Sequence, residues 1–339
     1  MGQGAAREAF HTVGMMTVPN RRRARDLQRT RYSAAYSSRL RQGLNLLREW
    51  ACDRGLTLRR LVKDVEKMNF HLAAFVQWGY ETGKNFHLIK HSVLAVQTEW
   101  PSLHLRLRLP WQSLRSWLRE LPVQNRTPLT LHFLNVLCPT ALICMQGAPD
   151  RKGRYLWRAL STLLRVGFHA LLRPGEAFGL YVEDILFGHE VGEPTVVIIR
   201  KPKNRFHMGR IQHAVIQDPR TISWLTYLVG QRSSGKLWPA TLQKARDMFK
   251  HLLQLRQLAG CNLTLSSCRA GGATHRYLQG EDVSKLRFAG RWANDNTMRA
   301  YIQEAAATLV SNQLSRAHAQ ALRDFEAATA FLQWPPPQQ

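Results

Sequence analysis

One short part of the chain has the pattern of β-strands, and this limits the fold more than any other feature. Residues 195–200 (TVVIIR) are rich in β-branched side chains, and residues 210–216 (RIQHAVI) follow them after a basic turn, KPKNRFHMG. Elsewhere apolar residues recur mainly at the spacing of an α-helix. The sequence therefore predicts a mostly α-helical α+β protein with one small antiparallel sheet.

The helical pattern also indicates how the chain is divided. Four amphipathic stretches follow one another in the first half, and a segment with two prolines then interrupts the pattern. The predicted parts are a basic N-terminal arm (1–37), a helical domain (38–121), a linker (122–128), a mainly helical domain with the sheet (129–332) and a Pro- and Gln-rich tail (333–339).

The charge balance points to a polyanionic partner. The chain has 48 Lys and Arg against 23 Asp and Glu, a formal net charge of +25. Such an excess is typical of proteins that bind nucleic acid or an anionic membrane surface. The longest apolar stretch, residues 129–145, is interrupted by His132, Asn135 and Pro139 and is shorter than the ~20 residues that a membrane span requires. We therefore expect no membrane association, which leaves nucleic acid.

The N-terminal arm is rich in arginine, with its densest run at Arg21, Arg22 and Arg23. Such a run can be a solvated tail, a set of phosphate contacts or a nuclear import signal. Residues 1–30 contain no apolar segment of the signal-peptide type, so an intracellular protein is expected, and a nuclear one if the source is eukaryotic. The five cysteines contain no C-x-x-C, and neither a disulfide framework nor a metal site is expected.

Two arginines stand in contexts that need an explanation. Arg173 follows a long apolar helix and has Glu176 three residues on, which predicts an ion pair between them. Arg269 precedes Gly271 and Gly272, and small residues there allow a helix to approach another backbone or a ligand closely. Each arginine taken alone has a structural explanation.

A third segment carries Trp292 and Tyr301, nine residues apart. Aromatic residues on a helix usually belong to the core, so this spacing alone decides nothing.

Taken in order, these segments resemble the tyrosine recombinase (phage integrase) family, and the Trp to Tyr segment resembles the Cre type. The family pattern is an Arg in R-x-x-E, a Lys on a β-hairpin turn, an H-x-x-R motif, a His or Trp, and a nucleophilic Tyr. The matching residues are Arg173 with Glu176, Lys203, Arg269, Trp292 and Tyr301. The resemblance implies that residues 38–121 are a core-binding, DNA-binding domain and that residues 129–332 are the catalytic domain.

This sequence departs from the family at one position. Ser266 stands three residues before Arg269, where the family usually has His or Lys. A serine can donate a hydrogen bond to phosphate but cannot shuttle a proton at neutral pH. The hairpin lysine also has neighbours, because Lys201 and Arg205 share its turn and could contact DNA there.

The resemblance implies a metal-free and cofactor-free cleavage of DNA. Arg173 and Arg269 would stabilise negative charge on the phosphate, and Tyr301 would attack the phosphorus to form a 3′-phosphotyrosyl intermediate. Lys203 would protonate the departing 5′ hydroxyl. Supporting roles would fall to Glu176, which would hold Arg173, and to the indole N–H of Trp292.

The expected function is therefore a site-specific recombinase or integrase of a mobile element that acts on double-stranded DNA and self-associates there, as a tetramer in the synaptic complex. The alternative is a DNA-binding protein of the same fold whose catalysis is impaired or lost at Ser266. A third hypothesis is a basic helical protein that binds RNA or chromatin. The helical stripe after Tyr301 either docks on another copy of the chain or packs on its own domain.

Overall fold

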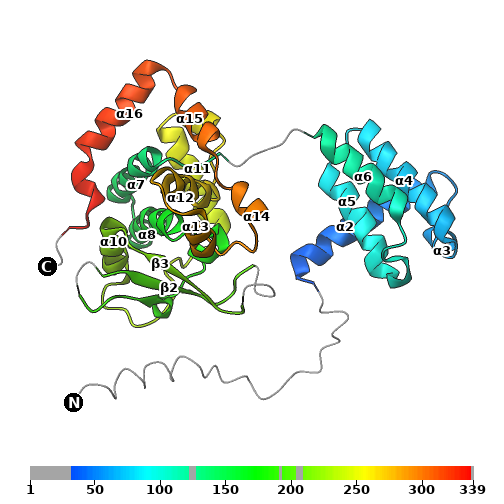
Figure 1. Cartoon of the computed structure of the whole chain (residues 1–339), viewed down its shortest axis with the longest axis horizontal. Helices are drawn as coiled ribbons and strands as arrows, with labels where there is room; N and C mark the ends of the chain where they lie inside the picture. Colours follow the sequence, from blue (N-terminus) through cyan, green and yellow to red (C-terminus); the bar gives the residue numbers. More distant parts are fainter. Residues whose placement is uncertain (1–31, 122–126, 191–192, 204–208, 337–339) are drawn as a thin grey trace, which may run out of the picture. The chain divides into compact units, whose positions relative to one another are not determined.

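The computed structural model describes residues 32–121, 127–190, 193–203 and 209–336. They belong to two units that divide between Val123 and Gln124, inside the predicted linker (Figure 1). The predicted DNA contacts Arg21, Arg22, Arg23 and Arg205 lie outside the described residues. No described helix is both long and apolar enough to cross a membrane.

The first unit consists of helices. These are α2 (Ala34–Cys52), α3 (Leu58–Leu61), α4 (Val65–Glu81), α5 (Phe86–Glu99), the 3₁₀ turn η1 (Pro101–Leu103) and α6 (Arg108–Glu120). The predicted start at residue 38 is four residues late, because Ser33 caps α2 by accepting a hydrogen bond from the Tyr36 backbone N–H. Residues 58–81 form two helices and not one, because Asp64 caps a new helix, α4, by accepting hydrogen bonds from the N–H groups of Glu66 and Lys67.

Close packing of α2 on α5 and of α4 on α6 forms the core of this unit. At Gly43 an added Cβ would lie 2.6 Å from the backbone nitrogen of Ser92, so only glycine allows α2 to approach α5 there. Trp50 and Phe75 meet edge to face in the core. Most of the periodic apolar residues of this unit are buried in its core, while Leu118 is 56% exposed.

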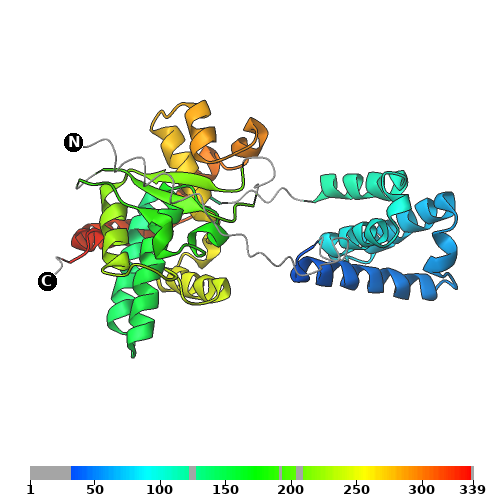
Figure 2. The ribbon, with the colours of Figure 1, turned by 90° about the horizontal axis from the view of Figure 1, so that it is seen from below.

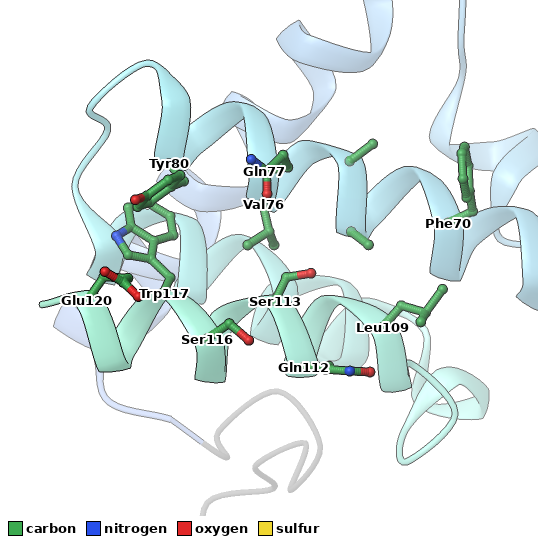
Figure 3. Close-up of a pocket in the computed structure, with 12 residues that line it drawn as sticks. Phe70, Val76, Gln77, Tyr80, Leu109, Gln112, Ser113, Ser116, Trp117 and Glu120 are labelled. Atoms are coloured by element: carbon green, nitrogen blue, oxygen red, sulfur yellow. The ribbon is translucent and has the colours of Figure 1, made fainter.

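A groove of about 650 Å³ lies between α4 and α6 on this unit. Figure 3 shows Tyr80 and Trp117 at one end of it and Phe70 with Leu109 at the other. Glu120 is the one charged residue in its lining, and none of the residues predicted to be catalytic lines it. The groove is therefore not a candidate active site.

The second unit carries the sheet, whose strand order is β1-β2-β3, all antiparallel. The strands are β1 (Ile185–Leu186), β2 (Thr195–Ile199) and β3 (Gln212–Ile216). Val197 of β2 is paired with Ala214 of β3, and the alternate residues of both strands are buried. The two predicted strands and their pairing are confirmed. The two-residue strand β1 was not predicted, because it is too short for its alternation to be visible.

The rest of this unit is mostly helical. Its helices are α7 (Leu131–Gln146), α8 (Arg151–His169), α9 (Pro174–Ala177), η2 (Val182–Asp184), α10 (Pro219–Val229), α11 (Leu242–Leu255), η3 (Ala259–Cys261), α12 (Ser267–Leu278), α13 (Val283–Ala289), α14 (Asp295–Arg299), α15 (Glu304–Asn312), α16 (Arg316–Ala328) and η4 (Ala330–Gln333). Figure 2 shows α13 and α14, in orange, gathered at one end of the unit, with the green hairpin of α7 and α8 extending to the other.

The glycines of α12 bring this helix unusually close to its neighbours. An added Cβ at Gly271 would lie 1.7 Å from the carbonyl oxygen of Leu129, and one at Gly272 would lie 2.0 Å from that of Phe168. The close approach predicted for these glycines is thus made to backbone. It fixes α12, and the arginine on its first turn, against the end of α8.

The chain after Tyr301 packs on its own unit. Ser315 caps α16 and divides the predicted continuous helix into α15 and α16. Val310 and Leu322 join the main core, and α16 lies along α7, as Figure 1 shows. Val310 and Leu322 of the apolar stripe therefore cover their own domain, while Ala317, Ala321 and Ala328 of the same stripe are exposed.

The predicted tail also begins too early, because Gln333 is buried. Its side chain accepts a hydrogen bond from the buried Arg165 and donates one to the carbonyl of Asn135, at 3.1 Å. Its own carbonyl accepts a hydrogen bond from the Trp224 indole, at 2.9 Å. Gln333 therefore locks η4 onto α7, α8 and α10. At the other end of the unit, the predicted linker ends too late, because Pro128 is buried.

Deletion of residues 313–339 should destabilise the second unit, because it uncovers α7 and removes the hydrogen-bond partner of the buried Arg165. We expect the melting temperature to fall by about 10 °C or more, at roughly 3 °C per kcal/mol for a domain of this size. Deletion of residues 335–339 alone is the control and should leave it unchanged. A soluble 1–312 protein with the original melting temperature would contradict this packing.

Candidate active site

The site is organised around the carboxylate of Glu176, in the short helix α9. Its side chain is 5% exposed. Oε2 accepts a hydrogen bond from the backbone N–H of Arg173, at 3.0 Å, and Oε1 accepts one from Arg173 Nη1, at 2.7 Å. The ion pair predicted from the R-x-x-E spacing is present. It orients Arg173, whose side chain remains 21% exposed.

Arg269 approaches the same carboxylate from the first turn of α12. Its side chain is 1% exposed, and Nη1 lies 3.9 Å from Glu176 Oε2. Nη1 donates to the carbonyl of Leu171 at 2.7 Å, and Nη2 donates to that of Gly290 at 2.5 Å. The Leu171 carbonyl lies in the segment after α8, and the Gly290 carbonyl lies in the segment after α13. Together with Glu176 of α9, three parts of the chain hold this guanidinium.

A third guanidinium, which sequence reasoning missed, completes the cluster. Arg291 Nη2 donates to Glu176 Oε2 at 3.2 Å and to the carbonyl of Leu171 at 3.1 Å, and the side chain is buried. Arg291 is the residue before Trp292, and nothing in its local pattern marks it as buried. The one sequence feature that could have indicated its burial is that Arg291 stands among apolar residues and a glycine, in FAGRW.

Three arginines around one carboxylate leave an excess of positive charge in a buried place. Burial raises the pKa of Glu176, but Arg291, and then Arg173, outweigh burial and hold it below its ordinary value. Burial lowers the pKa of the Arg269 guanidinium, and repulsion from Arg173 and Arg291 lowers it further. An anion bound between these groups would relieve that repulsion.

Trp292 and Tyr301 form the wall of the cluster. Their rings lie 5.3 Å apart, and the Arg269 guanidinium lies 4.7 Å from the indole and 5.1 Å from the phenol ring. Gly290 makes room for the indole, because an added Cβ there would lie 1.8 Å from it. Tyr301 follows α14, and its carbonyl accepts a hydrogen bond from the Thr274 hydroxyl of α12, at 3.2 Å. The segment between Trp292 and Tyr301 thus places the tyrosine ring against Arg269 of α12.

Two buried donors in the cluster and its wall have no hydrogen-bond partner among the described residues. They are the indole Nε1 of Trp292 and Nε of Arg269. Buried donors are rarely left unsatisfied, and a bound ligand or water is one explanation for such a group. Unpartnered buried donors also occur away from the cluster, at Trp50 Nε1 for example. Both donors are suited to an anionic oxygen.

The structure brings together Arg173, Glu176, Arg269, Trp292 and Tyr301. Ser266 is the half-buried residue just before α12, and its side chain does not cap that helix.

Lys201 and Lys203 follow β2 and are exposed. Within the described residues neither lysine forms a hydrogen bond or ion pair with the cluster. The described residues also contain no group of three or more His, Cys, Asp or Glu that could hold a metal ion.

Comparison with known proteins identifies the fold. No protein-family model matches the chain, and no curated protein does. Among solved structures, the chain is similar to the Tn1549 transposon integrase in complex with transposon right end DNA, with a TM-score of 0.52, 14% identity, and coverage of 86% of this chain and 98% of that chain. The chain is also similar to the same integrase in complex with circular intermediate DNA. The TM-score is 0.52 and the identity 14%, with coverage of 83% of this chain and 98% of that chain.

A further similar structure is the XerH site-specific recombinase bound to its palindromic difH substrate, with a TM-score of 0.49, 14% identity, and coverage of 78% of this chain and 72% of that chain. The likeness to the Tn1549 integrase shows that this chain has the fold of the tyrosine recombinases and integrases. The fold class expected from the sequence, mostly α with a small antiparallel sheet, is thereby confirmed.

Replacement of Glu176 by Gln should destabilise the protein by about 3–5 kcal/mol, because it leaves buried guanidiniums without a counter-charge. The carboxylate has a lowered pKa, so its contribution is fully present above its ordinary value of 4.5 and is lost as pH falls through the lower value in the folded protein. The difference in unfolding free energy between the wild type and Glu176→Gln should therefore shrink in acid.

Denaturant unfolding from pH 8 down to about pH 2.5, through and below the ordinary pKa of a glutamate, measures this. The control is Glu281→Gln, which removes a less buried ion pair with Arg276 and should cost about 0–1 kcal/mol. Equal losses in the two variants would contradict the central role of Glu176.

Proposed function

We propose that this protein is a DNA breaking and rejoining enzyme, a tyrosine recombinase that cleaves through a 3′-phosphotyrosyl intermediate. The observation that carries the proposal is the buried cluster of guanidiniums around one carboxylate, in ring contact with Tyr301. Such a cluster fits a phosphodiester, whose negative charge would balance the excess positive charge.

The arginines are suited to stabilising the transition state of phosphodiester cleavage. Charge develops on the nonbridging oxygens of the phosphate as the nucleophile adds, and fixed donors stabilise it without reorganisation. Glu176 and the carbonyls of Leu171 and Gly290 fix Arg173 and Arg269 in advance. The unpartnered Trp292 Nε1 would add a further donor to the phosphate.

Tyr301 would supply the nucleophile. Its phenolic oxygen would give up its proton to water and form a bond to phosphorus while the bond to the 5′ oxygen breaks, and the resulting phosphotyrosyl bond keeps the energy needed for rejoining. The departing oxygen needs a proton. Lys203, or its neighbour Lys201, would donate it from the β2–β3 connection, in keeping with the family pattern.

Double-stranded DNA is the proposed substrate and partner. The net charge of +25 favours a polyanion, and the similar integrase and XerH structures contain DNA. The first unit would act as the core-binding domain, with the arginines of the arm as added phosphate contacts. Recombination or transposition of a mobile element, with copies assembled as a tetramer on paired sites, would follow. The protein would be DNA-associated in the cell, and nuclear in a eukaryote.

Tyr301→Phe should abolish the covalent protein–DNA complex, because the phenylalanine lacks the attacking oxygen. The measurement is incubation with duplex DNA selected for binding from a random pool, followed by a denaturing gel. Tyr277→Phe is the matched control, because Tyr277 lies exposed on α12 outside the cluster. A complex that survives Tyr301→Phe, with the linked peptide mapping elsewhere, would contradict the assignment.

A second candidate function is sequence-specific DNA binding without cleavage, and Ser266 is the observation that favours it. Ser266→His should then raise a weak or undetectable rate of covalent complex formation by about 100-fold, because it adds a proton donor and acceptor to an otherwise intact cluster. DNA affinity, measured in parallel, should change little. An unchanged or lower rate would show that serine is the working residue or that another part of the site is lost.

A further inference from the structure

We propose that Arg291 is a positioning residue of this site, which acts through Glu176 and the carbonyl of Leu171 to hold Arg173 and Trp292 around Arg269. This inference rests on the proposed function, because the geometry that Arg291 holds is the one assigned to phosphodiester cleavage.

The contacts of Arg291 join the two segments that frame the site. Its guanidinium donates to Glu176 Oε2 and to the Leu171 carbonyl through Nη2, and to the carbonyls of Ala170 and Ala289 through Nη1, at 3.4 and 3.3 Å. Leu171 lies two residues before Arg173, and Arg291 is next to Trp292 in the chain. One side chain therefore links the segment that carries Arg173 to the segment that carries Trp292.

The backbone at both ends of this link adopts a conformation that its residues rarely take. Leu171 has φ of 52° and Arg291 has φ of 56°, both in the left-handed region. Side chains other than Gly, Asn and Asp adopt it only where surrounding contacts hold them there. The Leu171 carbonyl accepts hydrogen bonds from both Arg291 and Arg269, and this shared acceptor is such a contact.

Arg291 also controls the charge of Glu176. The charged groups that face this carboxylate are Arg173, from the start of α9, Arg269, from α12, and Arg291, from the segment after α13. Burial works to raise the pKa of Glu176, and the largest opposing effect comes from Arg291, ahead of Arg173. An ionised Glu176 forms the ion pair that holds Arg173, so Arg291 acts on Arg173 without touching it.

The test measures covalent complex formation from pH 4.5 to 8 with the full-length protein and a duplex selected for binding. Arg291→Ala should lower the rate about 100-fold, because a misplacement of about 1 Å is sufficient for that loss. DNA affinity should stay within about twofold. Arg291→Lys should recover part of the rate, because an ammonium can still pair with Glu176.

The pH profile separates positioning from a merely structural role. In Arg291→Ala the rate should fall at a higher pH on the acid side than in the wild type, because Glu176 takes up a proton more readily. Arg287→Ala is the matched control: Arg287 is a half-exposed arginine of α13 that pairs with Asp295 outside the cluster. It should keep the wild-type profile. An unshifted acid limb in Arg291→Ala would overturn the proposal.

A second measurement does not depend on cleavage. If Arg291 acts through Glu176, the fall in melting temperature caused by Arg291→Ala should shrink by at least half in the Glu176→Gln background. Additive losses would overturn the positioning role, whether or not DNA is cut. Absence of a covalent complex with the wild type would instead overturn the proposed function, and the melting temperatures would then decide the role of Arg291 alone.

Discussion

The carboxylate of Glu176 is the one group on which the arrangement of the second unit's site depends. A buried carboxylate costs several kcal/mol unless charged partners surround it, and here arginines from three separate segments do so. Arg269 and Arg291 also donate hydrogen bonds to backbone carbonyls, and the Leu171 carbonyl accepts from both. The ends of α8, α12 and α13 are therefore fixed relative to one another by a single ionised group.

This arrangement leaves more positive charge than the protein itself balances. Glu176 neutralises one guanidinium, while Arg269 is buried and the Trp292 indole nitrogen has no partner in the part of the chain that the structure describes. Such an excess of buried positive charge lowers the stability of the folded protein at this site. Binding of a phosphate would offset that loss of stability. The surplus inside the cluster and the net charge of +25 over the whole chain both favour the same kind of ligand.

The C-terminal segment shows where a sequence pattern is ambiguous. Apolar residues at helical spacing predict a helix that packs one face on an apolar surface. The pattern is the same whether that surface belongs to this copy of the chain or to another. Contacts distant in sequence show which residues of the segment pack on their own copy. Leu322 enters the main core, and Gln333 meets Arg165, 168 residues away along the chain. Neither contact has a local signature.

The features that depend only on neighbours along the chain follow from the amino-acid sequence. The two longer strands, the helical periodicity, the ion pair between Arg173 and Glu176 and the need for small residues after Arg269 all follow from spacings of a few residues. The tertiary structure alone decided the position of Arg291, because its bond to Glu176 spans 115 residues and its left-handed backbone is held by contacts from another segment. Local propensity describes what a segment can form, and burial against distant segments selects which charges meet.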